Sequence, residues 1–219
     1  PEASEAMTVH VEAAVDSFAG ALAAQDAGVH RIELCGPLHE GGTTPSAGLI
    51  ARSLERLLVS VHVLIRPRVG DFVYTDDEFE IMKRDIAVSK ELGADGVVIG
   101  ILTSEGEVDA DRLAELHAVA SPLHVGFHRA FDAVKDQDEA LELLVSLQFD
   151  TILTSGAAET AALGAERIKH LVERAGDRIG IIAGGSITSD SVSALVRDTG
   201  ARMVHSRAFS GMAGAVEGL

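Results

Sequence analysis

Charged and titratable side chains follow two apolar segments of this sequence, at the points where each segment ends. The apolar runs 61–65 and 125–127 are each closed by cations and an acid, and the second is also followed by a histidine. The residues concerned are Arg66, Arg68, Asp71, His128, Arg129 and Asp132. Burial of such groups without partners costs several kcal/mol, so we expect them to be satisfied by one another or by a ligand. Two strands that end in charge predict a polar site at one rim of a sheet or barrel.

Alternation along the predicted strands brings further polar residues to this rim, because every second residue of a strand faces the same side. On these faces, the polar residues nearest the C-terminal ends of the strands are Glu12, Glu33, Arg66, His128, Thr154 and His205. A carboxylate beside arginine stays ionised, while histidine moves a proton near neutral pH. The pattern indicates either a ligand-binding mouth or a polar plug in which Glu33 pairs with Arg66. We favour ligand binding because so many ionisable groups converge.

The glycine-rich loop after the expected strand 180–183 is a candidate anion site. Gly184, Gly185 and Ser186 precede a helix, where backbone N–H groups and the helix dipole favour an anion. Barrel enzymes commonly bind phosphate with the loops after strands seven and eight, and residues 205–207 would supply the second half. The alternative interpretation is a tight turn that requires positive φ. The candidate ligand-binding residues are therefore Glu12, Arg66, Arg68, Asp71, Arg129, Thr154, Ser155, Gly184, Gly185, Ser186, His205 and Ser206.

Three histidines are expected one layer lower in the same fold. His10, His62 and His124 fall on alternate strands and on the inward faces. A tris-imidazole metal site is one interpretation, and packed or solvated histidines at the barrel floor are the interpretation that we favour. The sequence carries no Ser–His–Asp ordering, nucleotide-binding glycine fingerprint, Walker loop or Cys-X-X-Cys pair.

Short apolar strand candidates alternate with helical patterns along the whole chain. The expected strands span 9–13, 31–35, 61–66, 96–102, 123–128, 151–155, 180–183 and 203–206, and the expected helices span 18–27, 47–58, 76–92, 109–119, 138–147, 162–175 and 189–198. Eight alternations without a break in composition predict an α/β fold, a TIM-type (β/α)8 barrel, as a single domain over 1–219. A doubly wound sheet is the alternative, but it leaves eight strands without an evident crossover arrangement. Only residues 209–219 follow the last strand, so we expect a short or incomplete final helix and a homo-oligomer that covers the open flank.

Composition excludes several classes of partner. Among 219 residues, 18 Lys and Arg stand against 34 Asp and Glu, and the formal net charge of −16 repels nucleic acid and anionic membranes. No apolar stretch reaches the length of a membrane span. The lone cysteine, Cys35, rules out an internal disulfide and fits a reducing compartment, so we predict a cytoplasmic protein. Residues 1–7 are expected to form a flexible N-terminal extension, with Met7 as a candidate natural start.

Five motifs resemble those of the CutC family, which is named for copper homeostasis. They are RIELC at 31–35, EGGTTPS at 40–46, RPRVGDF at 66–72, FHRAFD at 127–132 and LTSG at 153–156. They occur in the family's order, and the match covers the chain from about the first expected strand to the last. The resemblance implies a cytoplasmic TIM-like barrel that is often oligomeric and linked to copper handling, without an established reaction.

The chain departs from the family pattern at three positions. Family members often carry a cysteine where this sequence has Ala14, threonine is common at Gly126, and glycine is usual at Ser186. Cu(I) prefers thiolate and thioether ligands, so Cys35 is the candidate metal ligand. One cysteine makes no two-thiolate site within a subunit, which weakens the expectation of tight Cu(I) binding.

The sequence leaves three functional hypotheses open. The first is a CutC-type copper homeostasis protein that binds Cu(I), with no organic cofactor indicated. The second is an enzyme acting on a small phosphorylated or carboxylated metabolite, with the anion held by Arg66, Arg68 and the 184–186 loop. In that enzyme His128 would be the acid/base, with Glu33 or Asp132 as its charge partner or alternate base. The third is a scaffold whose polar mouth is purely structural.

Overall fold

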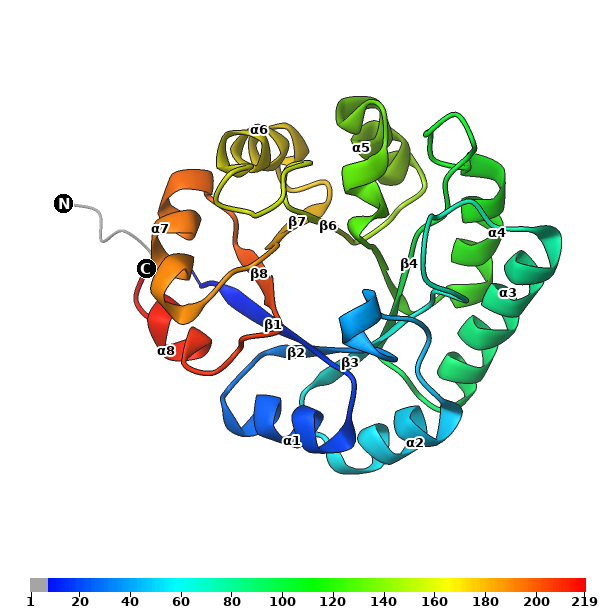
Figure 1. Ribbon diagram of the computed structural model, residues 1–219, viewed down its shortest axis with the longest axis horizontal. Helices are drawn as coiled ribbons and strands as arrows, with labels where there is room; N and C mark the ends of the chain where they lie inside the picture. The colour runs from blue at the N-terminus through cyan, green and yellow to red at the C-terminus, as the bar shows by residue number, and fades with distance from the viewer. Residues whose placement is uncertain (1–7) are drawn as a thin grey trace.

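The strands of this protein close into one parallel barrel. The computed structural model describes residues 8–219, so the extension predicted for residues 1–7 lies outside the described residues. Within that range eight strands pair in chain order and the last returns to the first, as Figure 1 shows. The strands are β1 His10–Val15, β2 Arg31–Leu34, β3 Ser60–Leu64, β4 Gly96–Ile99, β5 His124–Phe127, β6 Thr151–Thr154, β7 Gly180–Gly184 and β8 Met203–Ser206. The predicted TIM barrel is confirmed.

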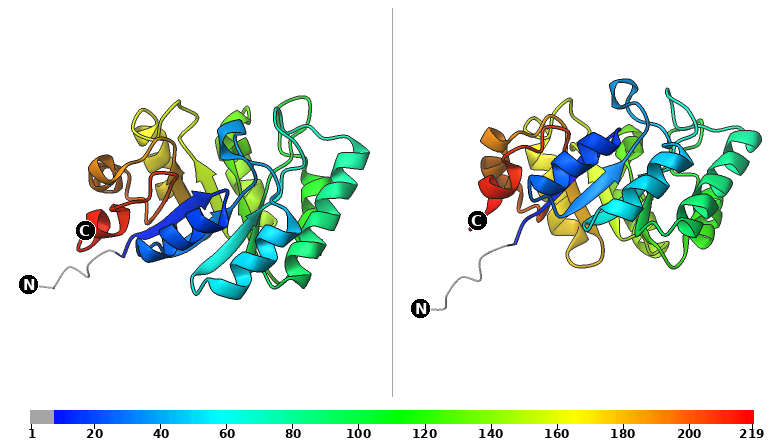
Figure 2. Two further views of the ribbon diagram at one scale, coloured as in Figure 1. Left: turned by 60° about the horizontal axis from the view of Figure 1, so that its bottom comes forward. Right: turned by 90° about the horizontal axis from the view of Figure 1, so that it is seen from below.

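Helices alternate with the strands and surround the barrel (Figures 1 and 2). They are α1 Phe18–Asp26, α2 Ala47–Arg56, α3 Asp76–Glu91, α4 Ala110–Ala120, α5 Gln137–Ser146, α6 Ala165–Ala175, α7 Ser189–Thr199 and α8 Met212–Val216. Two 3-10 helices, η1 Leu38–Glu40 and η2 Arg129–Ala133, lie in the loops after β2 and β5. The expected short final helix is confirmed: α8 has five residues and packs against α7 and β1.

Local sequence explains where several helices begin and end. Thr75 caps α3 in a reciprocal capping box with Glu78, and Asp76 and Asp77 add acidic charge to the first turn. Gly200 takes a left-handed conformation directly after α7, which glycine adopts without steric cost. These local signals set the helix boundaries and thereby the spacing of the strands.

The largest hydrophobic cluster of the protein lies between the strands and the helices, and the inside of the barrel is unusually polar. The outward faces contribute to a continuous apolar cluster, whereas a second cluster contains only Cys35, Leu64 and Val98 with Leu38 packed against it. TIM barrels commonly fill their interior with branched apolar side chains. Here several ionisable side chains are instead buried at inward positions, namely Glu12, Glu33, His62, Arg66 and His128. The fold therefore places its ionisable groups in the barrel interior.

Several expected strands end earlier than predicted: the strand expected at 96–102 ends at Ile99, and the early end of β5 bears on the site. The segment 123–128 was expected to remain extended, but β5 ends at Phe127 and the chain turns into η2. The His128 side chain caps η2 by accepting a hydrogen bond from the Ala130 N–H, and this bond favours the turn. Arg129 and Asp132 therefore lie in η2 and not on a continuation of β5.

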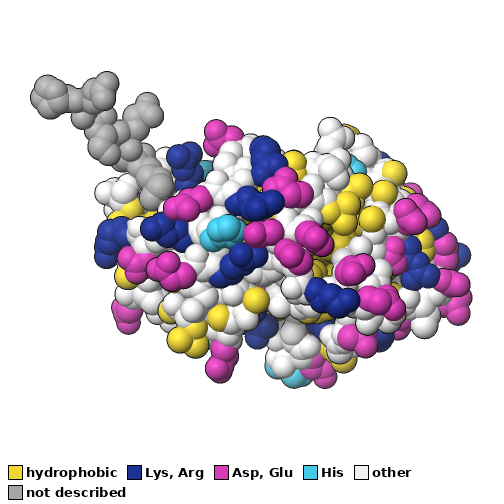
Figure 3. All heavy atoms as spheres, turned by 90° about the horizontal axis from the view of Figure 1, so that it is seen from above, with side chains coloured by type: hydrophobic (Ala, Val, Ile, Leu, Met, Phe, Trp, Pro, Cys, Tyr) yellow, Lys and Arg dark blue, Asp and Glu magenta, His cyan; other side chains and the backbone are white. Residues whose placement is uncertain are grey.

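The described helices and surface carry charge rather than long apolar stretches. None of the helices within residues 8–219 combines the length and the hydropathy that a bilayer crossing needs. Figure 3 shows acidic and basic side chains interspersed over one face of the molecule. The acidic excess is thus mixed with cations on this face rather than gathered in one block.

Candidate functional site

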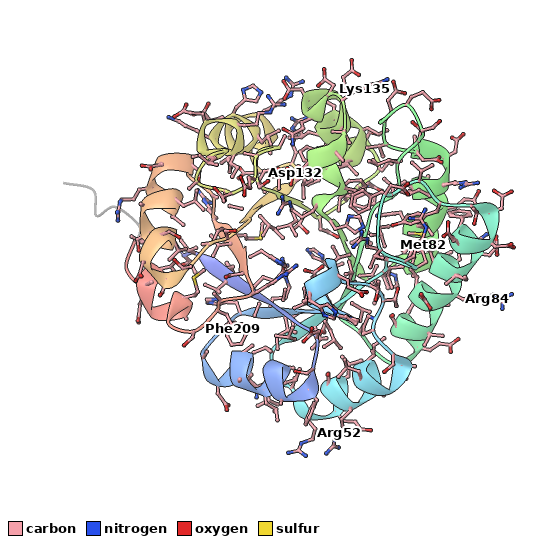
Figure 4. The ribbon with its side chains drawn as sticks, viewed as in Figure 1. Arg52, Met82, Arg84, Asp132, Lys135 and Phe209 are labelled. Atoms are coloured by element: carbon pink, nitrogen blue, oxygen red, sulfur yellow. The ribbon has the colours of Figure 1, made fainter. Side chains whose placement is uncertain are left out.

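A cavity of about 490 Å³ opens at the end of the barrel where the strands have their C-termini. Side chains from several strand ends and loops line it, among them Glu33, Cys35, Arg66, Phe72, His128, Arg129, His205 and Arg207. In Figure 4 side chains from several strands point into the centre of the ring. Sites of this fold form at this end, and the volume suits a small metabolite. Residues from β2, the β3 end, the β5 end and β8 therefore share one cavity, as the alternation along the strands predicts.

Arg66 is a buried cation without a carboxylate partner. The residue is 7% exposed, and its guanidinium donates to the carbonyl oxygens of Gly41, Gly42 and Gly70 at 3.2, 2.9 and 2.7 Å. It also lies 5.1 Å from the centre of the Phe72 ring. No acid within residues 8–219 pairs with Arg66, so the Glu33–Arg66 pair of the plug interpretation does not form. Carbonyl dipoles hold this side chain in place but leave its charge unneutralised.

His128 lines the cavity and carries a buried hydrogen-bond donor. Its Nδ1 accepts a bond of 3.1 Å from the Ala130 N–H, so in the neutral ring the proton resides on Nε2. That Nε2 is buried and has no acceptor within the described part of the chain. Burial, assisted by the nearby charge of Arg66, lowers the pKa of His128 to about 3. The imidazole is therefore neutral at physiological pH and is better suited to donate a hydrogen bond than to act as the predicted acid/base.

Two carboxylates and a histidine form a cluster deeper in the barrel. His205 Nδ1 lies 2.7 Å from Glu12 Oε1 and 3.5 Å from Glu33 Oε2, and Arg31 Nε lies 2.5 Å from Glu12 Oε2. Burial opposes ionisation of Glu12, but the hydrogen bond with His205 and the charge of Arg31 hold its pKa well below its usual range. Burial opposes charge on His205 as well, yet the two carboxylates keep its pKa raised. We therefore describe Glu12 and His205 as a carboxylate–imidazolium pair.

Glu33 differs from Glu12 because it has no close hydrogen-bond donor. Within residues 8–219 no group donates a hydrogen bond to its carboxylate, which lines the cavity. Burial raises the pKa of Glu33 to about 7, since the charge of His205 only partly offsets the desolvation. A carboxyl group with this pKa exchanges a proton at neutral pH, which is the property that general acid–base chemistry needs.

The cluster could hold a cation, and its ligand atoms define which kind. Single ligand atoms of Glu12, Glu33 and His205 lie within 4.8 Å of one another. Carboxylate and imidazole ligands suit hard or borderline divalent ions rather than Cu(I). Cys35 lines the cavity, but its thiol donates to the Glu33 carbonyl at 3.6 Å, and burial together with the charge of Glu33 raises its pKa well above the usual value. The neutral thiol is the form that this environment favours.

The loop after β7 forms part of the cavity wall. Gly185, Ser186 and Ile187 line the cavity, and their backbone N–H groups donate to no acceptor within the described range. Gly185 and Ser186 have φ values of 120° and 55°, so the turn with positive φ is present as well. Arg129 and Arg207 line the same cavity. Backbone donors beside two cations and the start of α7 form a surface that suits an anion.

Thr154 does not face the cavity, which corrects its predicted position. Its Oγ1 donates to Asp132 Oδ1 at 2.5 Å, outside the barrel interior, and Leu153 lines the cavity instead. The alternation of β6 is set by Thr151, which lies against the inward-facing Gly126. The odd-numbered residues of β6 therefore point into the barrel, and Thr154 points outward. The predicted assignment of inward-facing residues in this strand was shifted by one residue.

Asp132 organises the rim rather than lining the cavity. Its carboxylate accepts hydrogen bonds from Arg129 Nε, Ser155 N and Ala157 N in addition to Thr154. The Ser155 hydroxyl is engaged with Arg129 Nη2 and the Ala158 carbonyl. Figure 4 shows Asp132 on the α5 side of the ring. With both oxygens occupied, Asp132 and Ser155 hold Arg129 in position.

Arg68 and Asp71 lie outside the cavity. Arg68 donates to Asp71 at 2.9 Å and to Glu78 at 2.6 Å, and all three lie on the β3–α3 loop and the start of α3. Ser206 also has a structural contact, since its hydroxyl donates to the Ile187 carbonyl at 2.7 Å. The structure thus brings Arg66 and Ser186 to the cavity but leaves Arg68 and Asp71 on the surface.

Sequence reasoning missed several cavity residues, among them Phe72 and Glu159. Phe72, whose ring lies 5.0 Å from that of His128, forms part of the RPRVGDF segment and could have been found from its place beside Arg66. Glu159 lies in an irregular segment without any pattern that points to a site. A loop residue of this kind is placed only by the tertiary fold.

Comparisons with known sequences, and one with a solved structure, identify a family. Residues 9–210 match the model of the CutC family. A human protein named "Copper homeostasis protein cutC homolog" is 45% identical over 91% of this chain and 73% of its own length. A CutC family protein from Xanthomonas campestris pv. campestris is 47% identical over 90% of this chain and 82% of its own. A crystal structure from Streptococcus agalactiae, which carries the name of the copper homeostasis protein CutC, has a TM-score of 0.89 and 36% identity over 92% of this chain and 100% of that one.

Proposed function

The chain belongs to the CutC family, and on that premise we propose that it serves in copper homeostasis through a barrel mouth that binds a small anionic metabolite. The relatives' names supply the copper homeostasis part of this proposal. The observation that carries the anionic ligand is Arg66, a buried guanidinium without a carboxylate partner. A buried charge that lacks a counter-ion is costly, and a bound anion would neutralise it.

The polar groups around Arg66 support an acceptor as its partner. His128 Nε2 is a second buried donor without an acceptor. Phe72 contacts both side chains, with its ring 5.1 Å from the Arg66 guanidinium and 5.0 Å from the His128 ring. N–H donors have no free lone pair to offer a copper ion, whereas they match carboxylate, phosphate or carbonyl oxygens. This side of the cavity is therefore better suited to an oxyanion than to a soft metal.

The loop after β7 supports a second point of contact for the same ligand. The unoccupied N–H groups of Gly185, Ser186 and Ile187 adjoin the cationic Arg129 and Arg207. If a phosphate or carboxylate group of the ligand were bound at this position, the rest of the ligand could extend to Arg66 and His128. We propose a ligand with an anionic group at one end and an acceptor oxygen at the other.

The chemistry available to such a ligand is proton transfer by Glu33. Glu33 lines the cavity, and its carboxylate accepts no hydrogen bond from the described residues. Burial raises the pKa of Glu33 to about 7. His128 would polarise a carbonyl oxygen by donating from Nε2, a role that a neutral imidazole fulfils in known isomerisation sites. As an enzyme, the protein would therefore use Glu33 as acid/base and His128 as electrophile.

Thermal unfolding with anionic probes tests the binding proposal. We predict that inorganic phosphate, glycerol 3-phosphate or citrate stabilises the wild-type protein, with a gain of about 2.7 kcal/mol at roughly 100 times the dissociation constant. Arg66→Gln should lose most of this gain. The matched control Arg68→Gln, which removes a neighbouring arginine outside the cavity, should retain it. Equal stabilisation of Arg66→Gln and the wild type, or no stabilisation of the wild type by any probe, would contradict the proposal.

Direct Cu(I) binding at Cys35 is a second candidate function, favoured by the position of this thiol in the cavity wall. Anaerobic titration with Cu(I) against a chromophoric chelator measures it. Binding through Cys35 predicts competition by the wild type and its loss in Cys35→Ala. Failure of the wild type to compete removes this function while leaving the anionic ligand untouched. The cytoplasmic location remains a prediction that fractionation of cells would test.

A further inference from the structure

The opposite end of the barrel contains a second cavity, of about 300 Å³, whose wall is rich in histidine. Its histidines are His10, His30, His62 and His124. They form two contacting pairs, since the ring centres of His10 and His30 are 4.9 Å apart and those of His62 and His124 are 4.5 Å apart. All three histidines of the expected layer, His10, His62 and His124, line this cavity, and within it His10 contacts His30 while His62 contacts His124.

Gly96 allows the imidazoles of His62 and His124 to meet. The two histidines lie on β3 and β5, and Gly96 on the intervening β4 is in register with both. A Cβ atom at position 96 would lie 2.8 Å from the His62 ring and 2.8 Å from the His124 carbonyl oxygen. The missing side chain thus opens the space in which two side chains from non-adjacent strands come into contact.

Neither imidazole of this pair is committed to a protein partner. His62 is 3% exposed and forms no hydrogen bond within residues 8–219. His124 Nδ1 is buried without a hydrogen-bond partner, and Asp150 Oδ2 is 4.0 Å away. By contrast, His30 Nδ1 accepts a bond of 3.0 Å from the Val11 N–H. A buried imidazole nitrogen without a partner, such as His124 Nδ1, costs free energy that a bound metal ion would offset.

Both rings are in the protonation state that metals require. Burial lowers the pKa of His62 to about 3 and also lowers the pKa of His124. Each ring is therefore neutral at physiological pH and retains a nitrogen lone pair. Met203 lines the same cavity and adds a thioether to its wall, whereas both oxygens of Glu12 are engaged by Arg31 and His205. The net charge of −16 raises the local concentration of cations around the molecule.

We propose that His62 and His124 jointly bind one borderline transition-metal ion at the N-terminal mouth of the barrel. Neutral imidazole nitrogens suit Zn²⁺, Ni²⁺ and Cu²⁺, and water molecules would complete the coordination. This site is separate from the anionic ligand of the C-terminal mouth. It does not depend on the function proposed there.

Titration of the wild-type protein with Cu²⁺, followed by electron paramagnetic resonance, tests for the site, and variants then identify the ligands. We expect one tightly bound ion per chain and hyperfine splitting from two imidazole nitrogens. His62→Gln and His124→Gln should each weaken binding by more than about tenfold, since the loss of even an outer-shell partner costs that much. His117→Gln, which alters a histidine outside this cavity, is the matched control and should bind as the wild type does.

Other outcomes would overturn the proposal. Retention of the copper signal in both His62→Gln and His124→Gln would exclude the pair as ligands. Its loss in His205→Gln alone would place the ion at the Glu12, Glu33 and His205 cluster instead. If His62→Gln unfolds, the more exposed His124 and the wild-type spectrum still decide, because a signal with one imidazole nitrogen or none contradicts the site. Stabilisation by phosphate is measured separately, so failure here does not affect the C-terminal mouth.

Discussion

The role of His128 depends on which of its two ring nitrogens carries the proton. A histidine at the end of a barrel strand suggests an acid/base, since its unperturbed pKa lies near neutrality. Here the Ala130 N–H occupies Nδ1, and burial beside Arg66 lowers the pKa to about 3. The same residue type therefore becomes a neutral donor. Glu33, in contrast, gains acid/base character from burial.

The lowered pKa of His128 predicts a specific dependence of stability on pH. The folded-state pKa of about 3 lies below the usual histidine pKa of 6.5, so the unfolded chain takes up a proton first and the free energy of unfolding, undiminished by this group above pH 6.5, falls as pH drops below that value. Between about pH 7.5 and about pH 5 the wild type should lose about 2 kcal/mol more unfolding free energy than His128→Gln does. Urea denaturation of both proteins across this range measures the difference. Parallel curves would show that His128 is not held neutral by the fold.

The junction between η2 and β6 shows how one carboxylate can shape a site that it does not enter. Asp132, at the end of the FHRAFD segment, collects donors from Arg129, Thr154, Ser155 and Ala157. This network joins the loop after β5 to the loop after β6. The network thereby holds Arg129, which lines the cavity, in a defined position.

Substitution at this junction should cost stability in proportion to the donors that it leaves unpaired. Asp132→Ala strands several partly buried donors, so we expect a loss of about 3–5 kcal/mol, as for a buried pair that loses one member. Thr154→Val removes two hydrogen bonds with little change in shape, the one that the hydroxyl donates to Asp132 and the one that it accepts from the Gly156 N–H, and should cost about 2 kcal/mol. Chemical denaturation compares the two variants. Similar, small losses in both would show that the network contributes little.

At the scale of the whole molecule, the barrel places two different polar sites at its opposite ends. The C-terminal mouth carries cations and donors, and the N-terminal mouth carries neutral imidazoles. Between them the Glu12, Glu33 and His205 cluster occupies the interior. At the end of the helical shell α8 has only five residues, and its Met212 and Val216 are buried.

The oligomeric state is a further prediction at this scale. The short final helix and the family resemblance lead us to expect a homo-oligomer. Sedimentation equilibrium at micromolar concentration should give a mass of two or more chains. A monomer over the whole concentration range would contradict this expectation and would leave each barrel to function alone.

The sequence by itself determined the architecture and the rim on which the polar groups gather. Periodic apolar runs, and glycines at the ends of helices, are local features that can be recognised in the sequence. Because the ends of parallel strands in a barrel meet at one edge, Arg66 and His128 could be assigned to a common mouth in advance. Only the tertiary structure decided which groups pair there. Arg66 contacts carbonyl oxygens rather than Glu33, Thr154 faces Asp132, and His62 meets His124 across Gly96. These contacts depend on strand phase and on which neighbour reaches each atom, and such long-range geometry leaves no local pattern in the chain.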